Sequence, residues 1–398
     1  MTTANNNNDG TFRRIVLIVL DSVGVGAMPD AEEYDGHRYS NTLGNTAKAV
    51  GGLELPHLEA LGLGNLTEVK GVSPRRPAKG LFGKAALAAP NKDTTSGHWE
   101  MMGCVLKRKL PVYPRGFPED LLEKFIKETG VPGVLGNLSI SGTEVIKLFG
   151  DEHIKTGKPI VYTSADSVFQ IAAHEEAFGL KRLYDVCEKA RSLLRGEHEV
   201  GRVIARPFLG ENGHFTRTAN RRDYSLLPPS RTVLDELQKA GIPSLAVGKI
   251  CDIFAGRGIK DYVKTRNNAD GIRKTLLGID SHPEGLIFTN LVDFDMLYGH
   301  RNNPQGYAGA LEEFDNALPR IQEVLGEDDL LLLCSDHGND PTTPGTDHSR
   351  EYCLILGWSP RWREGKDVGL RRSLADIGAT VSENFGLPIL AGESFLRG

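Results

Sequence analysis

Three short apolar runs, each followed at once by acidic or imidazole side chains, constrain the fold of this chain more than any other feature. The runs extend from Ile15 to Leu20, from Gly285 to Val292 and from Leu330 to Cys334. The polar residues that follow them include Asp21, Asp295, His300, Asp336 and His337. Continuous apolar runs of this length are typical of parallel strands buried on both faces. Ligands gather beyond the carboxyl ends of such strands, so these side chains are expected to lie together.

Further apolar runs alternate with segments that have the pattern of helices. Strands are also predicted from Ser244 to Val247 and from Cys353 to Leu356. Helices are predicted from Thr232 to Ala240 and from Tyr307 to Val324. This alternation favours an α/β fold with a mostly parallel sheet.

The length of 398 residues predicts two domains, because a single core rarely keeps growing to this size. Pro and Gly interrupt residues 110–227, which also contain strand-like runs from Ile160 to Thr163 and from Val203 to Ala205. Since ligand-bearing strands occur on both sides, we interpret 110–227 as an inserted domain and residues 13–109 and 228–398 as one catalytic core. Residues 1–12, which include four consecutive Asn, lack apolar periodicity and are predicted to be a disordered extension.

The composition argues against several classes of function. A hydrophobic content of 39% and a charged content of 25% are ordinary for a soluble globular protein. The net charge of -5 gives no electrostatic reason to expect binding to nucleic acid or an anionic membrane. The five scattered cysteines lack a CxxC pair and fit reduced thiols, so a cytoplasmic location is expected. No apolar heptad or stripe indicates a stable dimer, and the chain is expected to be a monomer.

The carboxylates and imidazoles at the strand ends suit divalent metal ions such as Mn²⁺ or Zn²⁺. The candidate ligands are Asp21, Asp295, His300, Asp336, His337 and His348, the last eleven residues after His337. Six ligands are too many for one tetrahedral ion and suit two. A two-metal site indicates hydrolysis or phosphoryl transfer. Taken singly, each Asp could instead be a loop or helix-cap residue and each His a surface side chain.

The segment from Asn91 to Cys104 offers a nucleophile for such a site. Three adjacent hydroxyls, those of Thr94, Thr95 and Ser96, precede a Gly at the start of a predicted helix. A metal-bound hydroxyl there could be deprotonated, and the helix N-terminus would stabilise its phosphate ester. Ordinary N-capping is the alternative, although a cap needs only one hydroxyl.

Six collinear stretches of the chain resemble the phosphopentomutases, a family of the alkaline phosphatase superfamily. They are LDSVGVG (20–26), KDTTSGHWEMMG (92–103), VYTSADSVFQIAAHEE (161–176), RVIARPF (202–208), NLVDFDMLYGHRNNPQGY (290–307) and DHGNDPTTPGTDHSREY (336–352). The resemblance implies a core of alkaline phosphatase type with an inserted α/β cap domain. It assigns one ion, typically Mn²⁺, to Asp295, His300 and His348, and the other to Asp21, Asp336 and His337. It makes Thr94 the phosphorylated residue, while Ser96 stands where the family usually has threonine.

The activity that the resemblance implies is the interconversion of ribose 1-phosphate and ribose 5-phosphate and of their 2-deoxy forms. A phosphothreonine would exchange its phosphoryl group through a ribose bisphosphate, with glucose 1,6-bisphosphate or ribose 1,5-bisphosphate as activator. Candidates for holding the sugar and its distal phosphate are Ser164, Asp166, Arg202, Arg206 and Lys249. Arg suits this role because its planar fork matches phosphate oxygens.

Three other readings of the sequence remain open at this point. A phosphohydrolase could use the same metal core with water as the acceptor. A binding protein for sugar phosphates would need neither the ligands nor Thr94. A cofactor-independent phosphoglycerate mutase shares the core but uses a serine nucleophile. Near the site, His98 is expected in packing or support, Asp340 as a partner of a ligand imidazole, and His174 on an exposed helix face.

Overall fold

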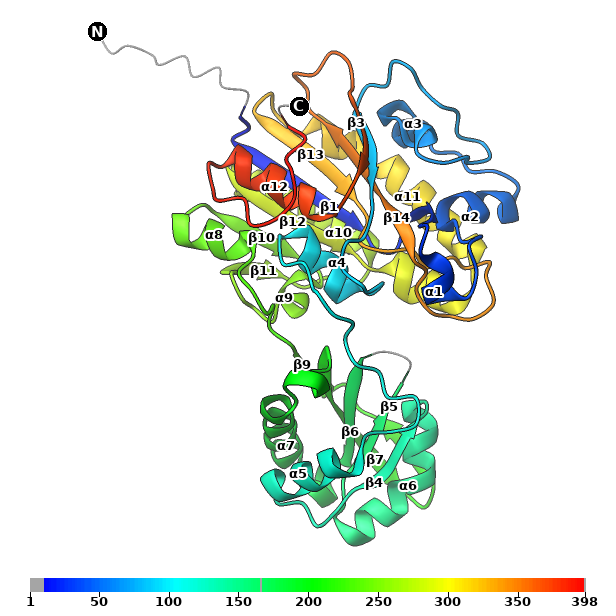
Figure 1. Cartoon of the computed structure of the whole chain (residues 1–398), viewed down its shortest axis with the longest axis vertical. Coiled ribbons are helices and arrows are strands. Elements are labelled where there is room, and N and C mark those ends of the chain that lie inside the picture. The colour runs from blue at the N-terminus through cyan, green and yellow to red at the C-terminus, as the bar shows by residue number, and fades with distance from the viewer. Residues whose placement is uncertain (1–10, 165–166, 397–398) are drawn as a thin grey trace. The chain divides into compact units, whose positions relative to one another are not determined.

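The computed structural model describes residues 11–164 and 167–396 and divides the chain into two compact units (Figure 1). The first unit contains the described residues up to Arg108 and those from Pro228 onward, and the second spans Lys109–Leu227. The second unit is therefore an insertion within the first. It lies where the sequence predicts an inserted domain, and its role as a cap stays a prediction.

A mixed sheet of nine strands forms the centre of the first unit among the described residues. Its order is β11-β10-β12-β1-β13-β14-β3-β15, with β2 paired to β14. The strands are β1 (Arg14–Leu20), β2 (Gly24–Ala27), β3 (Leu81–Ala85), β10 (Ser244–Val247), β11 (Asp261–Val263), β12 (Gly285–Leu291), β13 (Asp329–Cys334), β14 (Glu351–Trp358) and β15 (Asp367–Arg371). The five strands from β11 to β13 are parallel, and β14 runs antiparallel to both neighbours. The predicted α/β class with a mostly parallel core sheet is confirmed.

Helices cover both faces of this sheet (Figure 1). They are α1 (Ala31–Asp35), α2 (Thr42–Val50), α3 (Pro56–Leu61), α4 (Thr94–Met101), α8 (Val233–Ala240), α9 (Ile250–Ile253), α10 (Asn268–Ser281), α11 (Pro304–Glu323) and α12 (Ala375–Asn384), with short turns at η1 (Leu63–Asn65), η4 (Phe294–Tyr298) and η5 (Gly299–Arg301). All seven residues of β1 are buried, as expected for a strand covered on both sides. Val16, Ile18 and Leu20 share one core with side chains of α10 and α11, such as Ile279 and Phe314.

The register of the central strands brings their carboxyl ends to one edge of the sheet. Leu20 of β1 lies opposite Leu291 of β12, and Val19 lies opposite Cys334 of β13. The residues that follow these three strands must therefore emerge side by side. This edge carries the candidate ligands.

The second unit is a separate α/β layer structure with its own core. Its six strands within the described residues have the order β4-β5-β6-β7-β8, with β9 paired to β7. The elements are α5 (Glu119–Thr129), β4 (Leu135–Ser139), α6 (Gly142–Thr156), β5 (Ile160–Thr163), β6 (Val168–His174), η2 (Glu175–Gly179), α7 (Leu180–Leu193), η3 (Gly196–His198), β7 (Arg202–Glu211), β8 (His214–Arg217) and β9 (Arg222–Ser225). Apolar residues from α5, α7, β6 and β7 fill one core, and α6 closes a smaller one on the other face.

The folded chain begins earlier than the sequence predicts. Phe12, which was predicted to belong to the disordered extension, is only 3% exposed. Its ring packs edge-on against Trp362, the Arg361 guanidinium lies over it, and its backbone N–H donates to Asn384 Oδ1 at 2.6 Å. One aromatic side chain anchored in this way fixes a segment that has no periodicity of its own.

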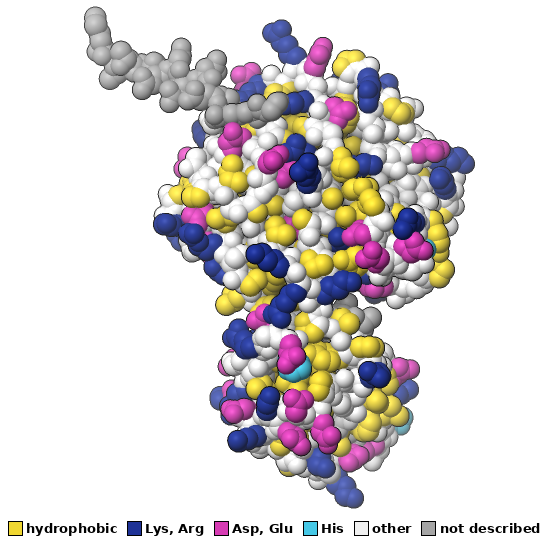
Figure 2. All heavy atoms as spheres, in the orientation of Figure 1, with side chains coloured by type: hydrophobic (Ala, Val, Ile, Leu, Met, Phe, Trp, Pro, Cys, Tyr) yellow, Lys and Arg dark blue, Asp and Glu magenta, His cyan; other side chains and the backbone are white. Residues whose placement is uncertain are grey.

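Figure 2 shows basic and acidic side chains interspersed on the visible face of each unit. Within residues 11–164 and 167–396, no helix is both long enough and apolar enough to cross a bilayer.

Candidate metal centre

The six candidate ligands form two groups at the carboxyl edge of the first unit's sheet. Asp21, Asp336 and His337 make one, here called the buried group, and Asp295, His300 and His348 make the other, the outer group. Within each group the potential ligand atoms lie within 4.8 Å of one another. The rings of His337 and His348 bring the groups together, with centroids 4.1 Å apart.

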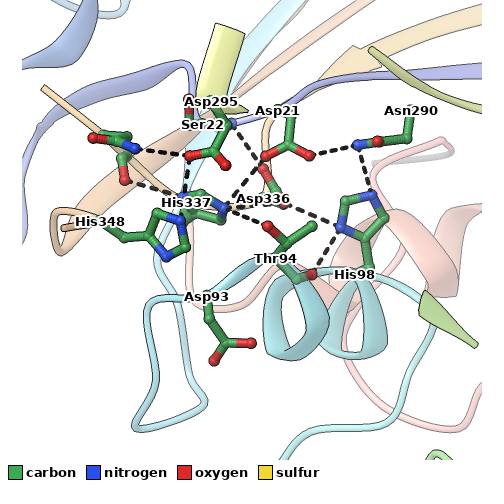
Figure 3. A network of polar contacts seen from close by, with 12 residues as sticks. Asp21, Ser22, Asp93, Thr94, His98, Asn290, Asp295, Asp336, His337 and His348 are labelled. Atoms are coloured by element: carbon green, nitrogen blue, oxygen red, sulfur yellow. Dashed lines mark hydrogen bonds and ion pairs between the residues drawn. The ribbon is translucent and has the colours of Figure 1, made fainter. Parts of the chain in front are cut away.

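The buried group is delivered by the two central strands of the sheet. Asp21 follows β1, and Asp336 and His337 follow β13. His337 Nε2 lies 3.4 Å from both Asp21 Oδ1 and Asp336 Oδ2 (Figure 3), and all three side chains are 0% exposed. The arrangement concentrates two carboxylates and an imidazole in a space without solvent.

The outer group comes from turns and a loop. Asp295 and His300 lie in η4 and η5 after β12, and His348 ends the ligand loop, defined here as residues 340–348. His300 Nε2 is 3.3 Å from Asp295 Oδ2, His348 Nε2 is 3.2 Å from Asp295 Oδ1, and the two Nε2 atoms are 3.1 Å apart. The His300 side chain is 35% exposed, which makes this group accessible from solution.

Each of the three carboxylates is oriented by a hydrogen bond to one of its oxygens. Asn290 Nδ2 donates to Asp21 Oδ2 at 2.8 Å, the Ser22 backbone N–H to Asp336 Oδ1 at 3.0 Å, and Asn339 Nδ2 to Asp295 Oδ1 at 2.8 Å. Metal ligands commonly need such supporting partners to fix their direction. Ser22 adopts a φ of 72°, in the left-handed region that non-glycine residues rarely occupy, and this conformation accompanies the bond to Asp336.

Backbone carbonyl groups orient two of the imidazoles. His300 Nδ1 lies 2.6 Å from the Thr346 carbonyl oxygen, and His337 Nδ1 lies 3.0 Å from that of Gly338. An Nδ1–H donated to a carbonyl leaves Nε2 as the atom that faces the other ligands. Both rings therefore present the nitrogen that a metal would bind.

Burial and neighbouring charges shift the pKa values of ligands in both groups. Burial and the neighbouring Asp336 raise the pKa of Asp21. Burial opposes the charged form of His337, but the carboxylates of Asp336 and Asp21 outweigh it and raise the pKa to about 10. Burial likewise opposes ionised Asp295, but His348 and His300 hold its pKa well below the ordinary range. A cation that binds at His337 must displace a proton.

The donor set fits divalent cations. Asp21 Oδ1 and Asp336 Oδ2 are buried and face imidazole nitrogens: both lie 3.4 Å from His337 Nε2, and Asp336 Oδ2 also lies 3.1 Å from His98 Nδ1. Two carboxylates buried this close together are costly unless positive charge compensates them. Mixed carboxylate and imidazole ligands suit Mn²⁺ or Zn²⁺.

Thr94 is the hydroxyl that faces this centre. Its Oγ1 lies 3.1 Å from His337 Nε2, at the first residue of α4 (Figure 3). The helix is capped by Asp93, whose Oδ1 accepts the Ser96 backbone N–H at 3.1 Å, while the Ser96 hydroxyl donates to Asp93 Oδ2 at 2.8 Å. The cap is thus a carboxylate, and the Thr94 hydroxyl is not used for capping.

Close backbone contact sets the position of α4. A Cβ atom on Gly97 would clash with the Asp336 carbonyl oxygen, so only glycine allows the helix to approach this closely. Beside it, the fully buried His98 places Nδ1 2.9 Å from the Thr94 carbonyl oxygen and 3.1 Å from Asp336 Oδ2. Its Nε2 lies 3.3 Å from Asn290 Nδ2, so His98 links the nucleophile segment to the supports of the buried group.

The candidate substrate-binding residues lie in both units. Lys249 follows β10 at the carboxyl edge of the first unit's sheet, whereas Ser164, Arg202 and Arg206 belong to the second unit. Arg206 Nε donates to Gln170 Oε1 at 3.2 Å, and Arg202 lies 3.6 Å from Asp223. Asp166 lies outside the described residues.

Two expectations about neighbouring residues are wrong. Asp340 bonds no imidazole among the described residues: its oxygens accept from the Asn41 backbone N–H at 2.9 Å and from Asn45 and Thr342. His174 is the last residue of β6 and is 8% exposed, because its ring bonds the backbone of η2 and Gly210 instead of facing solvent. Sequence reasoning also missed Asn290 and Asn339, although both stand inside motifs that end at ligands, which is the signal that could have found them.

Comparison with known proteins places the chain in a class and then in a family. The model of the metalloenzyme superfamily matches residues 13–389, so the chain belongs to that superfamily. A phosphopentomutase from Caldanaerobacter subterraneus subsp. tengcongensis is 56% identical over 97% of this chain and 98% of the relative. One from Symbiobacterium thermophilum is 57% identical over 96% of this chain and 98% of the relative. The chain therefore belongs to the phosphopentomutase family and is an enzyme of the mutase class of isomerases.

Solved structures with lower sequence identity also align with the chain. A phosphoglycerate mutase from Leishmania mexicana aligns with a TM-score of 0.47 and 12% identity, covering 98% of this chain and 97% of that one.

Proposed function

We propose that this enzyme interconverts the 1-phosphates and 5-phosphates of ribose and 2-deoxyribose, with Thr94 as the phosphoryl carrier. The observation that carries the proposal is the position of the Thr94 hydroxyl, 3.1 Å from His337 Nε2 at the start of α4. The membership of the phosphopentomutase family supports the choice of substrates. The nucleophile and the two ligand groups lie in one unit, so the phosphoryl transfer site is a property of the first unit.

In the proposed cycle, phospho-Thr94 donates its phosphoryl group to the free hydroxyl of the sugar phosphate. The phosphorus–Oγ1 bond of Thr94 breaks as the bond to the sugar oxygen forms, and the proton of the sugar hydroxyl is transferred to the departing Thr94 oxygen, which gives a sugar bisphosphate and free Thr94. The other phosphoryl group of that bisphosphate then returns to Thr94, and the isomerised monophosphate leaves. Two divalent cations, which we infer to be Mn²⁺ held by the buried and outer groups, would supply the charge stabilisation that phosphoryl transfer needs.

The residues around Thr94 have positioning roles in this scheme. The N-terminus of α4 favours the added negative charge of a phosphothreonine. Asp93 fixes the helix start without using the Thr94 hydroxyl. His98 holds the Thr94 carbonyl group and the Asp336 side chain at fixed distances. Phosphoryl transfer depends mostly on such positioning.

Recognition of the sugar and its distal phosphate is assigned to Lys249 of the first unit and to Ser164, Asp166, Arg202 and Arg206 of the second. The Lys249 side chain makes no hydrogen bond or ion pair with any described residue, and the residue stands at the edge that carries the metal groups. Arg206 uses only Nε in a hydrogen bond within the described part of the chain, which leaves its terminal nitrogens for an anion. We infer that the second unit acts as the cap over the substrate.

Three further features complete the proposal. Thr94 would first be phosphorylated by a sugar bisphosphate such as glucose 1,6-bisphosphate or ribose 1,5-bisphosphate. The enzyme would act in the cytoplasm, which the five free cysteines support because such thiols persist in a reducing compartment. It would act as a monomer, since all the proposed roles come from one chain.

The activity is tested by converting ribose 1-phosphate to ribose 5-phosphate with Mn²⁺, with and without catalytic glucose 1,6-bisphosphate, while free phosphate is monitored. Isomerisation without stoichiometric phosphate release is the expected result. Phosphate release without isomerisation would mean that water accepts the phosphoryl group, and the mutase proposal would be rejected.

The role of Thr94 is tested by Thr94→Ala, with Thr95→Ala as the matched control. Thr94→Ala should lower kcat by at least about a thousandfold, since it removes the covalent step. Its metal content should stay near that of the parent, and Thr95→Ala should remain active. Mass spectrometry after incubation with glucose 1,6-bisphosphate should find one phosphoryl group, which Thr94→Ala lacks. Retained turnover in Thr94→Ala would overturn the assignment.

A further inference from the structure

Lys92, two residues before Thr94, is held by three acceptors from two segments of the first unit, α1 and the ligand loop. Its Nζ donates to the His348 carbonyl oxygen at 2.6 Å and lies 3.0 Å from Asp35 Oδ1 and 3.1 Å from Asp347 Oδ2. The Lys92 side chain is 18% exposed and that of Asp35 is 4% exposed. A lysine that satisfies three acceptors in a mostly buried position is not an ordinary solvated surface charge.

These contacts connect the nucleophile segment to the outer group. Lys92 holds the backbone of His348, a candidate ligand, at the end of the ligand loop. The same loop provides the Thr346 carbonyl group that orients His300. Lys92 therefore bridges the chain that presents Thr94 and the loop that fixes both imidazoles of the outer group.

The neighbouring Arg350 makes a useful contrast. Its guanidinium is 3% exposed and donates to the carbonyl oxygens of Leu87, Ala89 and Asn91 at 2.9, 2.7 and 2.6 Å, besides pairing with Asp30. These bonds fasten residues 87–91 to β14 and touch no candidate ligand. Arg350 is thus placed to hold the fold, whereas Lys92 contacts a ligand residue directly.

We propose that Lys92 is a positioning residue that couples the outer metal group to the nucleophile. The inference rests on the proposed function, in which Thr94 carries the phosphoryl group between the two cations. The Thr94 hydroxyl contacts the buried group through His337, and no described hydrogen bond joins it to the outer group. Lys92 supplies that second link, so the spacing between the Thr94 hydroxyl and the ligands of the outer group depends on the ammonium of Lys92.

The test is the Lys92→Met variant, which keeps an unbranched side chain one atom shorter and removes the charge. Binding of Mn²⁺ is followed by calorimetry and by the electron paramagnetic resonance of free Mn²⁺. His300→Ala and His337→Ala serve as references for loss of the outer and buried ions. We expect the Mn²⁺ Kd of the outer group to rise about tenfold, the usual scale for loss of a supporting contact, with the buried group unchanged.

Kinetics provide the second readout. In Lys92→Met, kcat should fall about tenfold or more while KM for ribose 5-phosphate stays near that of the parent, because Lys92 belongs to the nucleophile segment and is not among the residues assigned to the sugar. Lys92→Arg keeps the charge and should recover part of both losses. Lys48→Met, at an exposed lysine of α2 with no partner in the described residues, should resemble the parent in every measurement.

Denaturant unfolding of the metal-free protein separates positioning from folding. Arg350→Lys serves as the reference for a structural defect, and it is expected to lower the free energy of unfolding and to weaken Mn²⁺ binding in both groups equally. If Lys92→Met does the same, Lys92 is only structural and the proposal is rejected. Unchanged outer-group affinity together with unchanged kcat would also reject it. Metal titration needs no sugar phosphate, so failure of the isomerisation assay would count against the proposed function and not against this inference.

Discussion

The buried and outer groups contain similar ligands but differ in exposure at one residue, because Asp295 and His348 are buried like the first group and His300 is partly exposed. The side chains of Asp21, Asp336 and His337 are 0% exposed and follow the two central strands, whereas His300 of the outer group is 35% exposed and lies in a turn. The buried group also contacts the nucleophile. The difference teaches that one position is built into the fold and the other can exchange with solution. We expect an ion in the buried group to exchange slowly and one in the outer group to exchange readily.

The largest effect should come from removing one histidine from each group. His337→Ala leaves two fully buried carboxylates beside the nucleophile without their partner, so kcat/KM should fall by at least about a thousandfold. His300→Ala removes a partly exposed ligand and should cost less, about tenfold to a hundredfold at saturating Mn²⁺. Steady-state kinetics and metal analysis measure both losses.

Added imidazole tests whether solvent reaches the position of the missing histidine in each of these two variants. It should restore part of the activity of His300→Ala, whose site opens to solvent, and none of that of His337→Ala. Equal losses in the two variants, or rescue of His337→Ala by imidazole, would show that the two groups do not differ in access.

The next effect tests the supports of the two groups separately. Asn290→Leu removes the donor to Asp21, and Asn339→Leu removes the donor to Asp295. Each should weaken Mn²⁺ binding about tenfold to a hundredfold in its own group and leave the other near that of the parent. Comparison with Mn²⁺ titrations of His337→Ala and His300→Ala identifies which of the two ions is bound more weakly. A loss of affinity in the group that the Asn does not contact would contradict these pairings.

The smallest effect concerns a buried carboxyl group that bonds the residue after the ligand loop. Glu351 accepts hydrogen bonds from the Thr42 hydroxyl at 2.7 Å and from the Ser349 hydroxyl at 2.6 Å, and burial raises its pKa to about 7. The folded protein therefore holds this proton more tightly than the unfolded chain does. The resulting stability is fully present below the unfolded pKa of about 4.5 and is lost as the pH rises through about 7, a change of at most about 3 kcal/mol.

Glu351→Gln should remove this dependence, because an amide does not titrate. Denaturant unfolding of the metal-free parent and variant between pH 4.5 and 8 measures the difference in the free energy of unfolding. Identical pH profiles for the two proteins would show that Glu351 is already ionised when folded, held by its hydrogen-bond donors.

Much of the fold could be predicted because the central strands are buried on both faces. The runs that predict β1, β10, β12 and β13 match their observed bounds to within one residue. The edge strand β15 was missed because its residues are mostly exposed and lack a continuous apolar run. Phe12 was missed because a single anchored ring leaves no periodic signal.

The site was less predictable beyond its motifs. The six ligands and Thr94 were proposed from strand ends and from a resemblance, and the structure brings all seven together. The supporting amides could not be recognised, since an Asn in a loop is as typical of turns as of metal sites. Asp340 shows the converse error, because a carboxylate near a ligand in sequence can bond the backbone of another segment instead.

The contact at Gly97 limits how this enzyme can be redesigned. At Gly97, α4 contacts the Asp336 carbonyl group directly, without an intervening side chain. No side chain at this contact can therefore be made smaller or larger to shift Thr94 relative to the buried group. Moving the nucleophile would require moving an entire helix. Efforts to change substrate preference should therefore leave residues 94–97 intact and introduce diversity in the second unit, which folds around its own core.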